Sequence, residues 1–145
     1  MSEEMIRRTT ELMREQTHSY HRLTSNCEQL IVALVRGNPE QIENLTRTGE
    51  RELLTIRSRL LQITSTLTTF AQARTSAPNR APISPETRRS FEVASQALIQ
   101  AAQAFQLVRQ RSASLAANGT VFAHACLEAC GGLATRYTSS YGKRR

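Results

Sequence analysis

The sequence has no tryptophan and no aspartate, and it has few residues that break helices. Four phenylalanines and three tyrosines are too few for a large aromatic core. The six glycines and four prolines are clustered, so long stretches can form helices without interruption. No run of residues approaches the about 18 apolar residues of a membrane span, and no secretory signal follows Met1. We therefore expect a cytoplasmic protein of one domain.

Two residue types carry nearly all of the charge. Of the 19 basic residues only Lys143 is not arginine, all 12 acidic residues are glutamate, and the net charge is +7. The positive excess lies in residues 75–145, which contain nine basic residues and only three acidic ones, Glu86, Glu92 and Glu128. A basic protein can bind nucleic acid or an anionic membrane. However, arginine interspersed with glutamate is more typical of a solvated helix face, so we do not expect nucleic acid as the main partner.

The cysteines and histidines do not form a convincing catalytic or metal site. Cys126 and Cys130 lie four residues apart on one helix face, but His124 points elsewhere, so a zinc site lacks its remaining ligands. His18 and His21 have no carboxylate pair or further histidine to complete a site. The sequence also contains no nucleophile elbow, phosphate-binding glycine loop or kinase motif. We expect no enzyme activity, no metal, no cofactor and no small-molecule substrate.

Apolar residues spaced alternately three and four apart predict two long helices, over residues 3–35 and 39–74. Between them, Gly37 suits a left-handed C-terminal cap, Asn38 an N-terminal cap and Pro39 the first helical position. Gln41 stands three residues after Asn38, as a capping box requires. So short a connection makes the two helices antiparallel. The two seams are Ile6, Thr9, Met13, Gln16, Tyr20, Leu23, Cys27, Leu30 and Leu34, and Ile42, Leu45, Gly49, Leu53, Ile56, Leu60, Ile63, Leu67 and Phe70.

Two positions of the second seam carry specific expectations. Leu60 is flanked by Ile56 and Ile63, so we expect it to be buried. Gly49 lacks a side chain and would allow the neighbouring helix to approach closely; alternatively, it is a tolerated glycine that costs about 1 kcal/mol.

The third part of the chain begins after a linker over residues 75–84. Ser84 and Pro85 predict the start of a third helix, over about 85–136, and residues 137–145 are expected to form a mobile tail. Asn118-Gly119 is expected to interrupt this helix, and residues 110–135 to be loosely ordered until a partner binds. Its seam is Phe91, Ala94, Leu98, Ala101 or Ala102, Phe105, Val108, Leu115, Phe122, Cys126, Ala129 and Leu133.

These elements predict one all-α domain over residues 1–145, a long antiparallel helical hairpin plus a third long helix, which together form a three-helix coiled-coil bundle. Between Arg111 and Arg136 the third helix has one charged residue, Glu128. The surface helices of a free-standing bundle usually carry more charge. The low charge therefore favours this segment as a surface that binds a partner helix, although the same residues could simply pack on the first two helices.

Three features together resemble the FlgN family of flagellar type III export chaperones. The stretch VALVRGNPEQIENLTRTGERELL, residues 32–54, resembles the family's helical hairpin with its short Gly–Asn turn. Asn118-Gly119 resembles the Asn–Gly pair that the family often has late in the third helix. Tyr141-Gly142 resembles the terminal Tyr–Gly segment, although Lys143-Arg144-Arg145 departs from the small or acidic residue and glycine that follow it in the family.

This resemblance implies a chaperone that binds the C-terminal helices of hook–filament junction (hook-associated) proteins and delivers them to the export gate. Tyr141 and Gly142 would contact the gate. Alternatives are a structural or regulatory coiled-coil protein without an export role, which could self-associate, and a basic helical protein that binds nucleic acid. The expected client-binding residues are Leu115, Asn118, Gly119, Val121, Phe122, Leu127 and Leu133.

Overall fold

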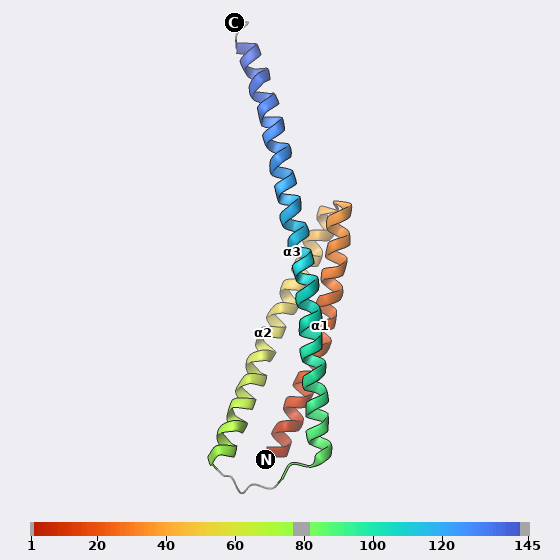
Figure 1. The fold of residues 1–145 in the computed structure, drawn as a ribbon, viewed down its shortest axis with the longest axis vertical. Coiled ribbons are helices and arrows are strands. Elements are labelled where there is room, and N and C mark those ends of the chain that lie inside the picture. The colour runs from red at the N-terminus through yellow and green to blue at the C-terminus, as the bar shows by residue number, and fades with distance from the viewer. Residues whose placement is uncertain (1, 77–81, 143–145) are drawn as a thin grey trace.

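The computed structural model describes the backbone of residues 2–76 and 82–142, and the side chains of residues 3–76 and 82–119. The chain forms three long helices, α1 (Ser2–Arg36), α2 (Pro39–Ser76) and α3 (Pro85–Gly142), and the described ranges contain no strand. The predicted all-α class is therefore confirmed. Helices α1 and α3 run in one direction and α2 runs in the other (Figure 1). No helix in the described part of the chain is long and apolar enough to cross a membrane.

The turn between α1 and α2 has the predicted geometry. Gly37 has a φ of 65°, in the left-handed region that favours glycine. Its N–H donates to the Leu34 carbonyl over 3.2 Å, and the Asn38 N–H donates to the Ala33 carbonyl over 3.2 Å, which together make a Schellman motif. The Asn38 side chain then accepts the Gln41 N–H over 3.2 Å and caps α2.

Helix α1 is the central element of the bundle. It packs against both α2 and α3, whereas no Cα atom of α2 lies within 8 Å of one in α3 over the described residues. At the lower end of Figure 1, the start of α1 lies between the end of α2 and the start of α3. The third helix therefore packs mainly on α1, and not equally on both helices of the hairpin.

Two apolar clusters join the three helices. The Met13 cluster consists of Met13, Ile63 and Ala94, one residue from each helix. The Leu23 cluster likewise consists of Leu23, Ile56 and Phe105. Partly buried residues pack around them: Leu12, Leu67, Phe91 and Leu98 around the first, and Tyr20, Cys27 and Leu53 around the second.

A buried polar layer lies between the two clusters. Gln16 and Ser19 on α1 are completely buried. The Gln16 amide donates to the Ile56 carbonyl over 2.9 Å, and the Arg59 guanidinium donates to Gln16 Oε1 and Ser19 Oγ over 3.2 and 2.8 Å. Arg59 also pairs with Glu15 at 3.4 Å. Because sliding α2 along α1 would leave these buried groups unpaired, the layer fixes the register of the two helices.

Higher along the hairpin, Gly49 allows the close approach that its place in the seam predicted. A Cβ atom at Gly49 would lie 2.9 Å from Asn26 Oδ1 and 3.8 Å from Leu23 Cδ1. The Asn26 amide donates to the Leu45 carbonyl over 3.1 Å, so α1 and α2 are linked there through a side chain that a larger residue would displace.

The prediction that Leu60 is buried is wrong. Leu60 is 48% exposed, whereas Ile56 and Ile63 on either side are each 4% exposed. Only α1 covers α2, and the side of α2 that faces α1 is the side of the two isoleucines. Leu60 lies on a neighbouring stripe that α3 would have to cover, and α3 does not approach it closely.

Helix α3 differs from its prediction in length and continuity. The backbone continues as one helix through Asn118-Gly119 and residues 110–135 and ends at Gly142, six residues beyond the predicted end and within the expected tail. A glycine in a helix costs about 1 kcal/mol relative to alanine, which weakens a helix without ending it. A glycine ends a helix readily when it takes a left-handed φ, and in the described chain only Gly37 does so.

The start of α3 is tied to the start of α1 through Glu3. Ser84 Oγ and Thr87 Oγ1 each donate to Glu3 Oε1 over 2.7 Å. Ser84 Oγ also accepts the Thr87 N–H over 3.3 Å, which makes it the predicted N-terminal cap. The hydrogen bonds from Ser84 and then Thr87 are the main causes that hold the pKa of the Glu3 carboxyl below its usual value.

We expect Glu3→Gln to destabilise the protein at about pH 7 and to have a smaller effect at about pH 2.5. A carboxyl with a lowered folded-state pKa stabilises the fold above its unfolded-state pKa, and this contribution is lost as the pH falls through the lowered value. Urea unfolding of both proteins at the two pH values measures the difference. Glu4→Gln is the matched control, since it removes the same charge from an exposed neighbour. Equal effects of the two substitutions at every pH would contradict the role of Glu3.

Candidate client-binding surface

The contacts between α1 and α3 give the register of the two helices, and this register shows at which residue of α3 the cover by α1 ends. Glu3 meets Thr87, and the rings of Tyr20 and Phe105 lie 5.8 Å apart between centroids. Both pairs are separated by about 85 residues in sequence, and the two helices run in parallel. Continuing this register places the end of α1, Arg36, at about the level of residues 120–121 in α3. Residues of α3 beyond this level have no α1 residue beside them.

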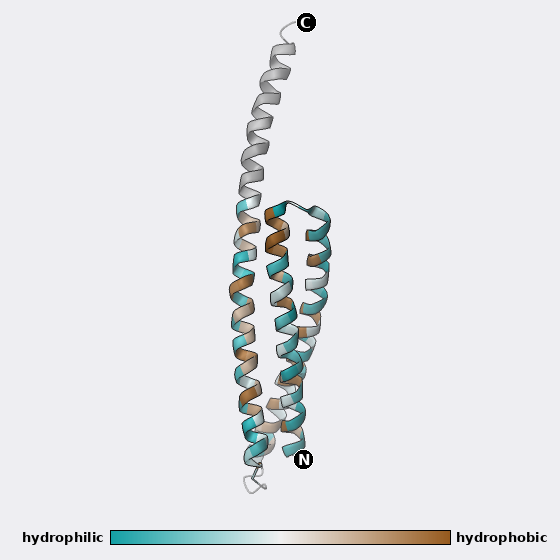
Figure 2. Ribbon diagram, turned by 90° about the vertical axis from the view of Figure 1, so that its right-hand side faces the viewer, coloured by the Kyte–Doolittle hydropathy of each residue, from teal (hydrophilic) through white to brown (hydrophobic). Residues whose placement is uncertain are grey.

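The last turns of α1 are apolar on every side. Residues 30–35 read LIVALV, and six consecutive positions cover the whole circumference of a helix. Ala33 is buried, but Val32 is 45% and Val35 is 74% exposed. Figure 2 shows this end of α1 in brown, beside the turn to α2. A group of exposed apolar side chains at one end of a bundle marks an interaction surface more readily than scattered ones do.

The described part of α3 adds three of the predicted client-binding residues at this end of the bundle. Leu115 is 37% exposed, and Asn118 and Gly119 are also exposed. A Cβ atom at Gly119 would have no neighbour within 4 Å, so the helix is open there. The apolar position predicted for Leu115 in the α3 seam is thus not buried by α1 or α2, and the residue remains free to contact a partner.

The remaining predicted site residues lie where the structure describes no side chains. The backbone at these positions belongs to α3. Their contacts, and those of the cysteine pair Cys126 and Cys130, are outside the described range. The residues are Val121, Phe122, Leu127 and Leu133 for the client, and Tyr141 and Gly142 for the export gate.

Sequence reasoning missed Val32 and Val35. The heptad pattern assigned Leu30 and Leu34 to the seam of the first helix, and it assigned no role to Val32 or Val35 beside them. The signal was present in the sequence, because a helix that is apolar at six successive positions cannot bury all of them against neighbours on one side. The exposed end of α1 therefore extends the candidate surface beyond α3.

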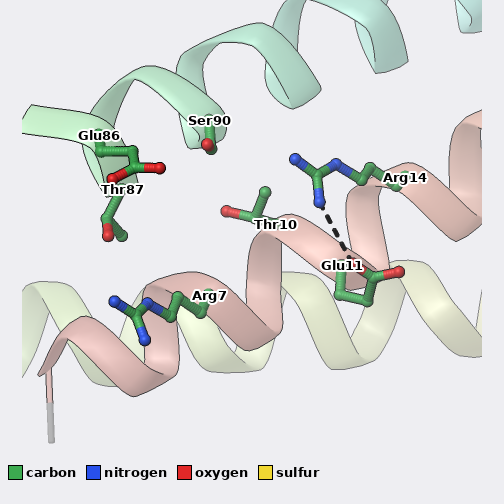
Figure 3. A pocket seen from close by; sticks show the side chains of 7 residues that line it. All are labelled: Arg7, Thr10, Glu11, Arg14, Glu86, Thr87 and Ser90. Carbon is green, nitrogen blue, oxygen red and sulfur yellow. Dashed lines mark hydrogen bonds and ion pairs between the residues drawn. The ribbon is translucent and has the colours of Figure 1, made fainter.

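A pocket of about 350 Å³ lies between the first turns of α1 and α3, away from this surface (Figure 3). Its charged residues have a net charge of zero, because Arg7 and Arg14 are balanced by Glu11 and Glu86. Arg7 also pairs with Glu3 at 3.4 Å and Arg14 with Glu11 at 3.4 Å, so neither arginine is reserved for an anionic ligand. Thr10, Thr87 and Ser90 complete the lining, and none of the lining residues is a histidine that could activate these hydroxyls.

Within the side chains that the structure describes, no three histidine, cysteine or acidic residues come close enough to hold a metal ion. Cys27 is partly buried beside the Leu23 cluster. Burial raises the pKa of its thiol, and the nearby Arg109 opposes this in part. A thiol with a raised pKa is a poor nucleophile near neutral pH, so Cys27 is better suited to packing than to chemistry.

No protein-family model, curated protein or solved structure matches the chain. A function can therefore be inferred only from the residues of the chain itself and from their geometry.

Proposed function

We propose that the chain is a cytoplasmic flagellar export chaperone. In this role it binds the C-terminal helices of hook–filament junction proteins, keeps them unassembled and delivers them to the type III export gate. It acts by protein binding and not by catalysis. The support from sequence is the resemblance of the hairpin turn, Asn118-Gly119 and Tyr141-Gly142 to the FlgN family.

The observation that carries the proposal is the mismatch in length between α1 and α3. Helix α1 has 35 residues and α3 has 58, and both begin at the same end of the bundle. The part of α3 that α1 cannot cover includes most of residues 112–135, in which Glu128 is the only charge. An apolar helix segment without a partner helix in its own chain suits the capture of an amphipathic helix from another protein.

The exposed end of α1 would complete the binding surface. Val32 and Val35 are exposed at the level where the uncovered part of α3 begins, close to the level of Leu115. A client helix lying along α3 would extend onto these residues and bury them. Each fully buried valine or leucine side chain contributes about 1.5–3 kcal/mol. A micromolar complex needs about 8 kcal/mol after the costs of association, so the uncovered part of α3 and the end of α1 would both have to contribute.

The direct test mixes the purified chain with purified C-terminal helical segments of junction proteins and measures binding by isothermal titration calorimetry. We expect one segment to bind each chain, with a negative heat-capacity change from apolar burial. A control titration uses short single-stranded RNA, which a basic protein could bind through its positive charge. Binding of RNA without binding of any junction segment would replace the chaperone by a nucleic-acid-binding protein. No binding to either would leave a structural coiled coil.

The terminal segment provides a separate prediction. Tyr141→Ala should leave the affinity for client segments unchanged, because Tyr141 lies beyond the predicted client-binding residues. It should weaken docking of the chaperone–client complex to the export gate, by analogy with the Tyr–Gly segment of the family. Pull-down of gate components with the wild-type and the variant complex measures this. A loss of client affinity in Tyr141→Ala would show that the tail belongs to the client-binding surface.

A further inference from the structure

Helix α1 is joined to α2 at several levels by hydrogen bonds of buried or partly buried side chains. The Asn26 amide donates to the Leu45 carbonyl, and the Gln16 amide donates to the Ile56 carbonyl. The two helices are also connected by only two residues, 37 and 38. Because a displacement would leave buried polar groups unpaired, α2 is held at one height on α1.

The contact between α1 and α3 lacks such hydrogen bonds above its lower end. Ser84 and Thr87 donate to Glu3. Over residues 3–76 and 82–115, no other side-chain hydrogen bond or ion pair joins α1 to α3. Eight residues, 77–84, separate α2 from α3, so this connection does not set the height of α3 as the short turn sets that of α2. Glu3 and side-chain packing therefore determine the position of α3 along α1.

Small side chains recur every seven residues on both sides of this contact. On α1 they are Thr10, Thr17 and Thr24, and on α3 they are Thr87, Ala94 and Ala101. Residues seven apart lie on nearly the same face of a helix. Thr10 and Thr87 both line the pocket between the first turns of α1 and α3, so these two faces meet (Figure 3). Ala94 and Ala101 are each 3% exposed, and α1 is the helix that packs closely on α3.

In the observed register, one of the three threonines does not face a small residue. Glu3 meets Thr87, so steps of seven along both parallel helices set Thr10 opposite Ala94, Thr17 opposite Ala101 and Thr24 opposite Val108. The Thr24 hydroxyl is buried and has no hydrogen-bond partner among the described residues. A buried hydroxyl without a partner destabilises the contact in which it lies.

A displacement of α3 by one heptad toward its own C-terminal end removes this mismatch. It sets Thr10 opposite Thr87, Thr17 opposite Ala94 and Thr24 opposite Ala101, so that each threonine faces a small residue. The larger residues of α3 repeat with the same period, and each takes the place of the next: Phe91, Leu98 and Phe105. The opposite displacement is unfavourable, because it sets Thr17 against Val108 and Thr24 against Leu115.

We propose that α3 slides along α1 between two registers, the observed one and a second one displaced by one heptad toward the C-terminal end of α3. The hydrogen bonds of Glu3 exist only in the first register and favour it. Packed helices change register in discrete steps, because side chains that interdigitate do not allow intermediate positions. The slide is a property of the bundle itself and does not depend on the chaperone role.

The second register exposes more of α3 beyond the end of α1. The end of α1 then lies seven residues earlier than 120–121, at the level of residues 113–114 of α3, so that Leu115, Asn118 and Gly119 lie beyond it. The uncovered part of the helix becomes longer by about 10 Å. A partner that binds the uncovered part would favour the second register. This last consequence rests on the proposed function.

Disulfide trapping within one chain measures the register. The three native cysteines are first changed to serine, and Thr17→Cys is then combined in turn with Ala101→Cys, Ala94→Cys and Val108→Cys. The first pair reports the observed register, the second the proposed register, and the third an equal displacement in the opposite direction. Each displaced pair is about 10 Å apart along the axis, whereas a disulfide needs Cα atoms within about 7 Å. Mass spectrometry after mild oxidation of dilute protein measures the rate of closure.

We expect the Thr17–Ala101 and Thr17–Ala94 cysteine pairs both to close. The Thr17–Val108 pair should close at least tenfold more slowly than the Thr17–Ala94 pair. General opening of the bundle would allow both displaced pairs to close equally, so the third pair is the matched control. Closure of the Thr17–Ala101 pair alone, or equal rates for the two displaced pairs, would overturn the proposal.

Glu3→Ala tests in the same assay whether Glu3 favours the observed register. Loss of the hydrogen bonds from Ser84 and Thr87 should raise the closure rate of the Thr17–Ala94 pair at least threefold relative to that of the Thr17–Ala101 pair. Glu4→Ala is the control, because it removes the same charge from an exposed neighbour. Circular dichroism of every variant checks that the helices are retained. An equal ratio in the Glu3 and Glu4 variants would refute the role of Glu3.

Discussion

Leu23→Ala is expected to lower the free energy of unfolding by about 2–5 kcal/mol. Leu23 is 2% exposed and lies in the cluster that joins all three helices, with Ile56 on α2 and Phe105 on α3. Truncation removes the apolar contacts and leaves a cavity, because the helices on either side are held in place by the polar layer and by the close contact at Gly49. A domain of this size has a total stability of about 5–15 kcal/mol, so the loss is a large fraction of it.

Urea unfolding followed by circular dichroism measures this loss, and Leu60→Ala is the matched control. The same atoms are removed from a side chain that is 48% exposed. We expect the control to change the free energy of unfolding by about 0.5 kcal/mol or less. Equal losses for the two variants would contradict the packing of the three helices.

Most of the local structure could be predicted because neighbouring residues determine it. Gly37 takes a positive φ and Asn38 caps the next helix, since a chain that ends one helix and starts another within two residues has few other choices. The α1 seam was predicted fully: each of its nine residues is buried or partly buried. Helix α1 has a neighbour on two sides, so a broad seam on it finds cover.

The same reasoning failed for Leu60 because a heptad pattern identifies a stripe without showing what covers it. On α2 the pattern includes Ile56 and Ile63, which are buried, and Leu60, which is half-exposed because α3 does not come close to α2. Whether α3 approaches α2 depends on the packing of all three helices, which includes the polar layer formed by Gln16, Ser19 and Arg59. The sequence placed Gln16 in the seam but did not indicate which residue would satisfy its side chain.

The client-binding site stays a prediction. Low charge after Arg111 suggested it, and the structure shows that Leu115, Asn118 and Gly119 are exposed. The prediction of a broken helix rested on Asn118-Gly119 and gave too little weight to the alanines beside it. Alanine has the highest helix propensity, and residues 113–117 read ASLAA. The exposure of Val32 and Val35 was not predicted, although the run LIVALV over residues 30–35 carried its signal.

Removing α3 after Gly119 is expected to abolish client binding while the bundle stays folded. The described packing of α3 on α1 lies before this point, and α1 itself ends at about the level of residues 120–121, where the removed part begins. Ser112, which is 9% exposed, also remains in place. The cut removes Val121, Phe122, Leu127 and Leu133 together. We expect the affinity for a junction-protein segment to fall at least 100-fold, which corresponds to about 2.7 kcal/mol.

A second truncation, after Arg111, separates the contribution of residues 112–119, which lie near the end of α1, from that of the rest of α3. It also removes Leu115 and uncovers the apolar end of α1, so it should lower the thermal midpoint, which the cut after Gly119 should leave nearly unchanged. Calorimetric titration and thermal melts of both truncated chains provide the two readouts.

If the chain cut after Gly119 still binds junction segments with wild-type affinity, the client lies on the exposed end of α1 and on Leu115. If the chain cut after Arg111 also binds them fully, the surface lies on α1 and α2, because the first two helices are then sufficient to hold the client.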